Sequence, residues 1–123
     1  MPTQNETRGA LEFLLAEASG HRSRNEVTIE SGQDLKAGHV LGKVSSSGEY
    51  KEYNPGNADG SETAVALLGH DVDATGGAKQ ATIIDNDAEA HTDLLVYFDG
   101  ASDAEKDTAN AELFNQSGIR VRS

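Results

Sequence analysis

Carboxylates and histidines are the residues of this chain whose types could do chemistry. The sequence has 21 Asp and Glu, four His and no Cys. Without cysteine, the chain can form neither a disulfide nor a thiolate metal site, and it has no Cys nucleophile. The histidines have none of the short spacings that are typical of metal ligands; they are His21, His39, His70 and His91. We therefore expect structural histidines and no metal site.

The acid-rich residues 85–89 suggest a calcium loop, which the spacing does not support. An EF-hand loop that began at Asp85 would need Gly at its sixth position and Glu at its twelfth. The sequence has Ala90 and Val96 at these positions. Asp71 and Asp73 form another close pair, and they most simply mark an acidic turn.

Motifs for nucleophilic catalysis and phosphate binding do not occur in the sequence. There is no G-x-S-x-G. The glycines at positions 38, 42, 48, 56 and 60 fit neither G-x-G-x-x-G nor the P-loop. Because acids occur throughout the chain, a pair of carboxylates is no specific sign of general acid–base catalysis. We predict no catalytic residue, no cofactor and no enzymatic activity.

The charge distribution argues against nucleic acid as a partner. Ten Lys and Arg against 21 Asp and Glu give a formal net charge of −11. Phosphate binding needs a basic field, so we expect no direct contact with nucleic acid. All five arginines lie near the two ends of the chain; they are Arg8, Arg22, Arg24, Arg120 and Arg122.

Size and composition indicate a single domain with a small apolar core. The chain has 123 residues, of which 36% are hydrophobic and 5% aromatic. This is enough for one modest core, and a chain this lean in apolar residues either contains disorder or binds a partner. We see no signal-peptide pattern and no segment long enough to cross a bilayer, so we expect no membrane partner.

The first 34 residues differ from the rest. Leu11, Leu14, Leu15 and Ala18 have helical spacing, which predicts a short amphipathic helix too short to be stable alone. Residues 27–29 predict a brief strand. We expect residues 1–34 to form a flexible arm, partly disordered in isolation, that orders on a partner. The alternative is a disordered tail with chance periodicity.

Residues 35–123 predict a β-rich domain with one short C-terminal helix. Ser102 and Glu105 form a capping box and Gly118 is placed to end the helix. Ala104, Ala111, Leu113 and Phe114 are its expected apolar contacts. The predicted strands cover residues 38–44 and 49–53 as a hairpin, 63–72 with a bend at Gly69, 80–84, 94–98 and 119–122. The predicted fold is therefore mainly β, with a compact domain preceded by an arm.

Three stretches occur together in a familiar order. They are residues 37–44 with the hairpin at Tyr50 and the loop that ends at Asp59-Gly60, residues 66–74, and residues 101–106 with the helix and residues 118–121. In this order and spacing the chain resembles the lambda-like phage head decoration protein family over residues 27–122. The resemblance implies a β-clip-like fold and a homotrimer at threefold and quasi-threefold sites of the expanded capsid. The protein would then bind the major capsid protein and stabilise the head against the pressure of the packaged genome. It would lie on the capsid exterior of the virion, after assembly in the host cytoplasm.

The resemblance also implies which residues bind the shell. In the family, the N-terminal segment adds a strand to the edge of a capsid-protein sheet. By position, this role falls on Glu26, Val27, Thr28 and Ile29, and the preceding Leu11, Leu14, Leu15, Arg22 and Arg24 complete the expected capsid-binding arm. Arg120 and Arg122 are expected to face the shell, while the acidic middle of the chain faces solvent. The leading stretch is longer than in the family, which leaves open how much of it binds.

Two other functions stay open from the residues alone. A nucleotide hydrolase on a related β-clip trimer would need phosphate-binding Ser, Arg and Gly, whereas the arginines here lie only at the ends. Turnover of nucleoside triphosphates with magnesium would support it. A carbohydrate-binding virion module would need aromatic stacking surfaces, and aromatics are few; glycan binding without capsid binding would support it.

Overall fold

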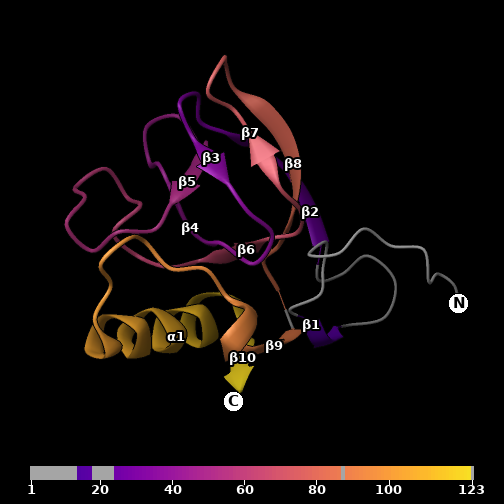
Figure 1. Ribbon diagram of the computed structural model, residues 1–123, viewed down its shortest axis with the longest axis vertical. Coiled ribbons are helices and arrows are strands. Elements are labelled where there is room, and N and C mark those ends of the chain that lie inside the picture. Colours follow the sequence, from indigo (N-terminus) through magenta and orange to yellow (C-terminus); the bar gives the residue numbers. More distant parts are fainter. Residues whose placement is uncertain (1–13, 18–23, 87, 123) are drawn as a thin grey trace, which may run out of the picture.

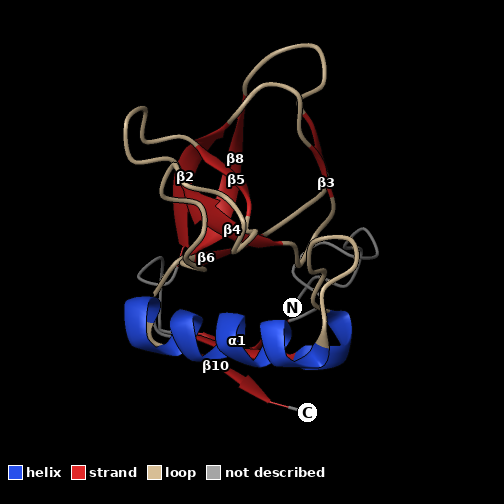
Figure 2. Ribbon diagram, turned by 90° about the vertical axis from the view of Figure 1, so that its left-hand side faces the viewer, coloured by secondary structure: helices blue, strands red, loops and turns tan. Residues whose placement is uncertain are grey.

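A closed five-stranded barrel, with a helix lying across one end of it, makes up most of the described chain (Figures 1 and 2). The computed structural model describes residues 14–17, 24–86 and 88–122. The elements in chain order are β1 Leu14–Glu17, β2 Arg24–Ile29, β3 Asp34–Leu35, β4 Val40–Lys43, β5 Tyr50–Glu52, β6 Ala66–Leu68, β7 Val72–Asp73, β8 Lys79–Ile84, β9 Ala88–His91, a 3₁₀ turn η1 Thr92–Leu94, α1 Asp103–Ser117 and β10 Ile119–Arg122.

The barrel has the strand order β2-β5-β4-β6-β8. β2 pairs with β8 antiparallel over all six residues, from Arg24↔Ile84 to Ile29↔Lys79. β2 and β5 are parallel and pair at Ile29↔Tyr50, and this contact closes the barrel. β4 is antiparallel to both β5 and β6. Closure leaves the barrel with few open strand edges of its own.

Two smaller sheets complete the fold. β9 lies between β1 and β10, antiparallel to the first and parallel to the second. This three-stranded sheet lies near α1 at the lower end of the molecule in Figure 1, and α1 contacts β10. β3 and β7 form a separate antiparallel pair.

Consecutive apolar residues in the barrel strands serve two different cores. Side chains alternate between the faces of a strand, so neighbours in sequence point in opposite directions. Val40, Leu67 and Ile84 are buried in the cluster that also holds Leu113 of α1 and Ile119 of β10. Their neighbours Leu41, Leu68 and Ile83 are buried in the second cluster with Ile29. The apolar doublets at 40–41, 67–68 and 83–84 therefore join the barrel interior to the layer that carries α1.

The helix has the predicted ends. The Ser102 side chain accepts a hydrogen bond from the Glu105 N–H, and Glu105 Oε1 accepts one from the Ser102 N–H. Gly118 ends the helix in the left-handed conformation with φ 67°. The expected apolar contacts were only partly correct. Leu113 is buried, whereas Ala104 and Ala111 are exposed and Phe114 is 48% exposed, because Ala109 takes the second buried position.

The mainly β architecture with a C-terminal helix is confirmed. The predicted strands at 38–44, 49–53, 80–84 and 119–122 appear as β4, β5, β8 and β10, and the strand at 63–72 divides near Gly69 into β6 and β7. The strand predicted at 94–98 is wrong. Leu94 ends η1 instead, and the extended segment after it makes one bridge, Val96↔His39.

The N-terminal region also differs from the prediction. The helix predicted from residues 11–18 is wrong over 14–17, which form β1 and pair with β9; its other positions lie outside the described residues. Helical spacing of four apolar residues cannot outweigh an available strand edge, because an isolated short helix is unstable. Residues 24–29 of the expected arm form the barrel strand β2.

Candidate functional site

The expected capsid-binding residues fall into two groups in the structure. Leu14 and Leu15 lie in β1, at the edge of the small sheet, and Arg24 to Ile29 lie in β2, within the barrel. Leu11 and Arg22 lie outside the described residues. The two groups therefore occupy different sheets.

Side chains of β2 are engaged with the barrel. Ile29 is fully buried and Val27 packs against the same cluster. On the opposite face, Glu26 accepts a hydrogen bond from Thr82 Oγ1, and the strand's Thr28 pairs with Gln80 across the sheet. Arg24, Asn25, Glu26 and Thr82 line a hollow of about 470 Å³ at the start of the strand. β2 is therefore part of the folded body.

The small sheet brings together β1, from the N-terminal part of the described chain, and β10, from its C-terminal part. β1 pairs with β9 at Leu14↔Ala90, Ala16↔Glu89 and Glu17↔Ala88, with an irregularity between the first two pairs. β10 pairs with β9 in four successive positions, from Ile119↔Ala88 to Arg122↔His91. An N-terminal segment and the arginine-bearing C-terminal strand, expected separately to face the shell, thus share one sheet (Figure 1).

Alternation along β10 directs its arginines away from the core. Ile119 is fully buried, whereas Arg120 and Arg122 are exposed. The Arg120 guanidinium lies 4.9 Å from the centre of the exposed Phe114 ring, a cation–π contact. Arg122 Nη1 lies 3.7 Å from Glu89 Oε2. Exposed pairs of this kind add little stability, so these two contacts hold the arginines only weakly.

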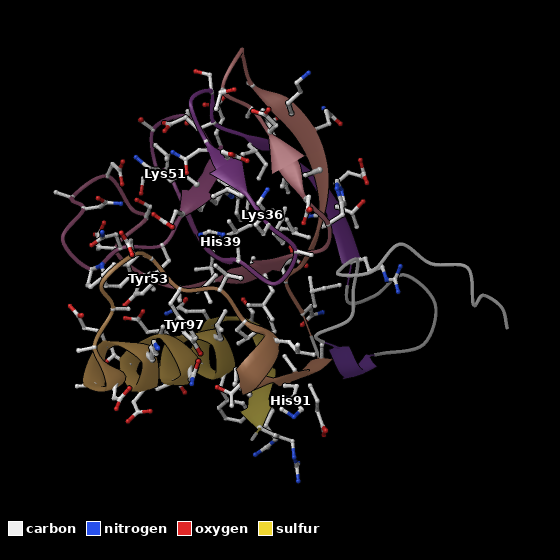
Figure 3. All side chains as sticks on the ribbon, in the orientation of Figure 1. Lys36, His39, Lys51, Tyr53, His91 and Tyr97 are labelled. Carbon is white, nitrogen blue, oxygen red and sulfur yellow. The ribbon has the colours of Figure 1, made fainter. Side chains whose placement is uncertain are left out.

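The histidines in the described part of the chain contact the protein's own groups. His39, 6% exposed, has Nε2 2.6 Å from Glu52 Oε2, and Figure 3 shows it in the interior near Lys36. His70 Nε2 accepts the Thr82 N–H at 3.1 Å, while Nδ1 lies 3.1 Å from the Asp71 carbonyl. Across the described residues, no three His, Asp or Glu side chains are grouped so that they could hold a metal ion. No helix of the described chain is long and apolar enough to cross a membrane.

The loop at 54–62 contains Asp59, a carboxylate whose pKa its neighbours lower. Both the hydroxyl and the backbone N–H of Ser61 donate to Asp59 Oδ1, and Lys51 Nζ lies 3.4 Å from Asp59 Oδ2 and 3.5 Å from Glu30 Oε1. The Ser61 hydrogen bonds, helped by Lys51, lower the pKa of Asp59 to about 2. These contacts hold the loop in its own conformation and account for the shift structurally.

A family model decides between the interpretations that the residues left open. The model of the bacteriophage lambda head decoration protein D matches residues 3–119. The chain belongs to the lambda head decoration protein D family. A search of the curated proteins finds no match.

Membership of the head decoration protein D family confirms the resemblance and fixes the function in outline. The protein binds the phage capsid, stabilises it and lies on the capsid exterior of the virion. Proteins of this family are structural and are not enzymes, so the prediction of no enzymatic activity is confirmed and the hydrolase interpretation is wrong.

Sequence reasoning missed β9, the central strand of the small sheet. Ala88 and Ala90 are buried, while Glu89 and His91 alternate with them. This alternation is the signal of a strand. It was hidden because the preceding acids invited a calcium interpretation and because alanine is a weak strand former.

Proposed function

We propose that this head decoration protein acts as a homotrimer at threefold and quasi-threefold sites of the expanded capsid. Its N-terminal segment binds the major capsid protein and thereby staples neighbouring capsomers against the pressure of the packaged genome. The observation that supports this proposal is the small sheet, which joins N-terminal β1 and arginine-bearing β10 through β9.

The sheet gives the segment a suitable form for docking. An edge strand exposes backbone N–H and C=O groups that a strand from another protein can pair with. β1 is an outer strand of its sheet. Arg120 and Arg122, on the other outer strand, supply positive charge in a chain of net charge −11. The β10 edge thus carries positive charge, whereas the middle of the chain is acidic. In this proposal the β10 edge faces the shell and the acidic middle faces solvent.

In a trimer, three N-terminal segments that each bind weakly can together hold the protein on the capsid. Ordering a segment on binding costs free energy, so one arm alone binds weakly. Three arms on one trimer act at high effective concentration, which raises affinity by roughly 10²–10⁴. Selective binding to the expanded shell requires only that the capsid site is formed after expansion and misaligned before it.

We place the binding arm before Arg24. Leu11, Leu14, Leu15 and Arg22 all precede β2, whereas Glu26 to Ile29 are paired along β8. Removing β2 would open the barrel, so a deletion through residue 30 would not separate binding from folding.

The test is co-sedimentation with expanded capsids of the full chain and of chains lacking residues 1–13 or 1–23. We expect circular dichroism to show that the barrel stays folded in both truncated chains. In the chain that lacks residues 1–23, capsid binding should weaken by about tenfold or more, since the avidity of three arms is lost. Full-strength binding by a folded chain lacking residues 1–23 would exclude the arm.

A second measurement tests the trimer. Cryo-electron microscopy of decorated heads should show three copies around each threefold and quasi-threefold axis. Monomers on the shell would contradict the proposal.

A third measurement tests the charge of β10. Arg120→Gln and Arg122→Gln should weaken capsid binding and reduce its salt dependence, because they remove charges from β10. Lys79→Gln, which removes an exposed charge at the start of β8, is the matched control and should leave binding unchanged.

A further inference from the structure

The chain contains two Asp-Gly dipeptides, Asp59-Gly60 and Asp99-Gly100. In such a pair, the backbone nitrogen of the glycine can attack the side-chain carboxyl of the aspartate, because glycine has no side chain to obstruct the approach. Whether this happens in a folded protein depends on the freedom of the two groups. The two pairs differ in their hydrogen bonds and in the space around them.

Asp59-Gly60 is protected on both sides of the reaction. The nucleophile is engaged, because the Gly60 N–H donates to Glu62 Oε1 at 2.8 Å. The electrophile is less reactive, because the Ser61 hydrogen bonds lower the pKa of Asp59 to about 2 and so make its protonated, more electrophilic form rarer. There is also no room to move: a Cβ placed on Gly60 would lie 2.5 Å from the Lys43 carbonyl oxygen.

Asp99-Gly100 has none of these restraints. Both residues are exposed, and a Cβ placed on Gly100 would meet nothing within 4 Å. They are the central residues of a turn that the Ala101 N–H closes on the Phe98 carbonyl at 3.1 Å. Gly100 has φ 84°, as the third residue of a type II turn requires. The hydrogen bond that closes the turn thus uses the amide of Ala101 and not that of Gly100.

We propose that Asp99-Gly100 is a site of spontaneous aspartate isomerisation. The Gly100 nitrogen loses its proton and forms a bond to Cγ of the protonated Asp99 carboxyl. The bond from Cγ to the hydroxyl oxygen breaks, and the hydroxyl leaves with the amide proton as water, which gives a cyclic succinimide. Water then adds to one of the two ring carbonyls. Opening at the side-chain carbonyl restores aspartate, and opening at the main-chain carbonyl gives isoaspartate, in which the backbone runs through the former side chain. One water leaves and one enters, so the mass does not change and no oxidant is needed.

The position of this turn gives the modification a structural effect. It lies two residues before Ser102, the N-cap of α1, and residues 95–101 with Lys106 line a hollow of about 320 Å³. Isoaspartate adds one atom to the backbone, so we expect it to disturb the turn and the capping box that follows it. A protein on the outside of a virion is not resynthesised, so the product accumulates with the age of the particle.

The experiment incubates the purified full chain at neutral pH and physiological temperature in water enriched in oxygen-18. Peptide mapping then measures heavy-oxygen uptake and isoaspartate at each site. We expect both at Asp99, at a level at least several-fold above Asp59. In denaturant the two sites should react at similar rates, which shows that the difference arises from folding.

Two variants complete the test. Asp99→Glu lengthens the side chain, disfavours the five-membered ring and should abolish the uptake at this position. Glu62→Ala frees the Gly60 N–H and should increase uptake at Asp59. The isomerised protein should melt a few degrees lower, roughly 2–8 °C, as expected from the loss of a helix cap. Equal and low uptake at both sites of the folded chain would overturn the proposal.

Discussion

The backbone N–H of Ala64 donates a hydrogen bond to Glu112 Oε1 at 2.9 Å and so joins α1 to the segment that leads into β6. Ser117 Oγ makes a second link to the same segment, where it donates to the Val65 carbonyl. Within α1, the buried side chains are those of Ala109 and Leu113. Polar links therefore hold much of the helix in place across the end of the barrel.

Glu112→Ala should destabilise the protein by about 1–3 kcal/mol, because it leaves the Ala64 N–H without its acceptor beside the fully buried Ala64. Glu112→Gln keeps an acceptor oxygen at the same place and should cost less. Urea unfolding followed by circular dichroism measures both. Equal losses for the two variants would show that the charge of Glu112, and not its hydrogen bond, supports the helix.

The helix could be predicted from the sequence because its determinants are local. Ser102 and Glu105 form the capping box at its start, and Gly118 ends it in the left-handed conformation. Each behaves as predicted. Which side it buries was not predictable in the same way. Leu113 and Phe114 are adjacent apolar residues, and only the packing of the barrel end decides that Leu113 enters the core and Phe114 stays exposed.

Gly42→Ala should be strongly destabilising, by roughly 1–3 kcal/mol or more, as expected of overpacking in a tight core. A Cβ at position 42 would lie 2.5 Å from both Cα and the carbonyl oxygen of Ser61. These are backbone atoms, so the clash cannot be relieved by rotating a side chain. The measurement is again the free energy of unfolding in urea.

Gly76→Ala is the matched control for this prediction. A Cβ at position 76 would meet nothing within 4 Å. Its effect should stay within about 0.5 kcal/mol, as for other surface substitutions. If Gly42→Ala were as mild as Gly76→Ala, β4 and the loop at Ser61 would have to be farther apart than the structure places them.

Asp59 should titrate with a midpoint near pH 2, measured by carbon NMR of its carboxyl group. Because the pKa in the folded protein lies below the ordinary value of 3.8, the fold favours the carboxylate. The resulting stabilisation is present above about pH 4 and is lost as the pH falls toward 2. Ser61→Ala removes the largest cause of the shift, so the midpoint should rise toward 3.8. A midpoint unchanged by this substitution would assign the shift to the remaining contacts, which are the Ser61 backbone N–H and Lys51.

The proposed binding surface was less predictable than the fold, since it depends on contacts between distant parts of the chain. The alternation of Ile119, Arg120, Val121 and Arg122 correctly gave a strand with outward arginines. Nothing local to residues 14–17 or 88–91 shows that they pair, or that β9 would connect β1 to β10. Closure of the barrel through Ile29 and Tyr50 is equally a contact between segments that the sequence does not mark as neighbours.

A disulfide between positions 16 and 89 would test whether β1 must leave β9 to bind the shell. Ala16 and Glu89 are paired across the sheet, where Cα atoms lie about 5 Å apart, a separation that a disulfide can bridge. The chain has no cysteine, so Ala16→Cys with Glu89→Cys introduces the only thiols. If the segment binds capsid by exchanging β9 for a capsid strand, the oxidised variant should lose binding by about tenfold or more, and reduction should restore it. The Glu89→Cys single variant controls for the loss of the Glu89–Arg122 ion pair, and the Ala16→Cys single variant controls for the substitution in β1. Undiminished binding by the fully oxidised variant would mean that β1 stays on its own sheet, and that its open edge, the residues before it or the β10 edge makes the contact.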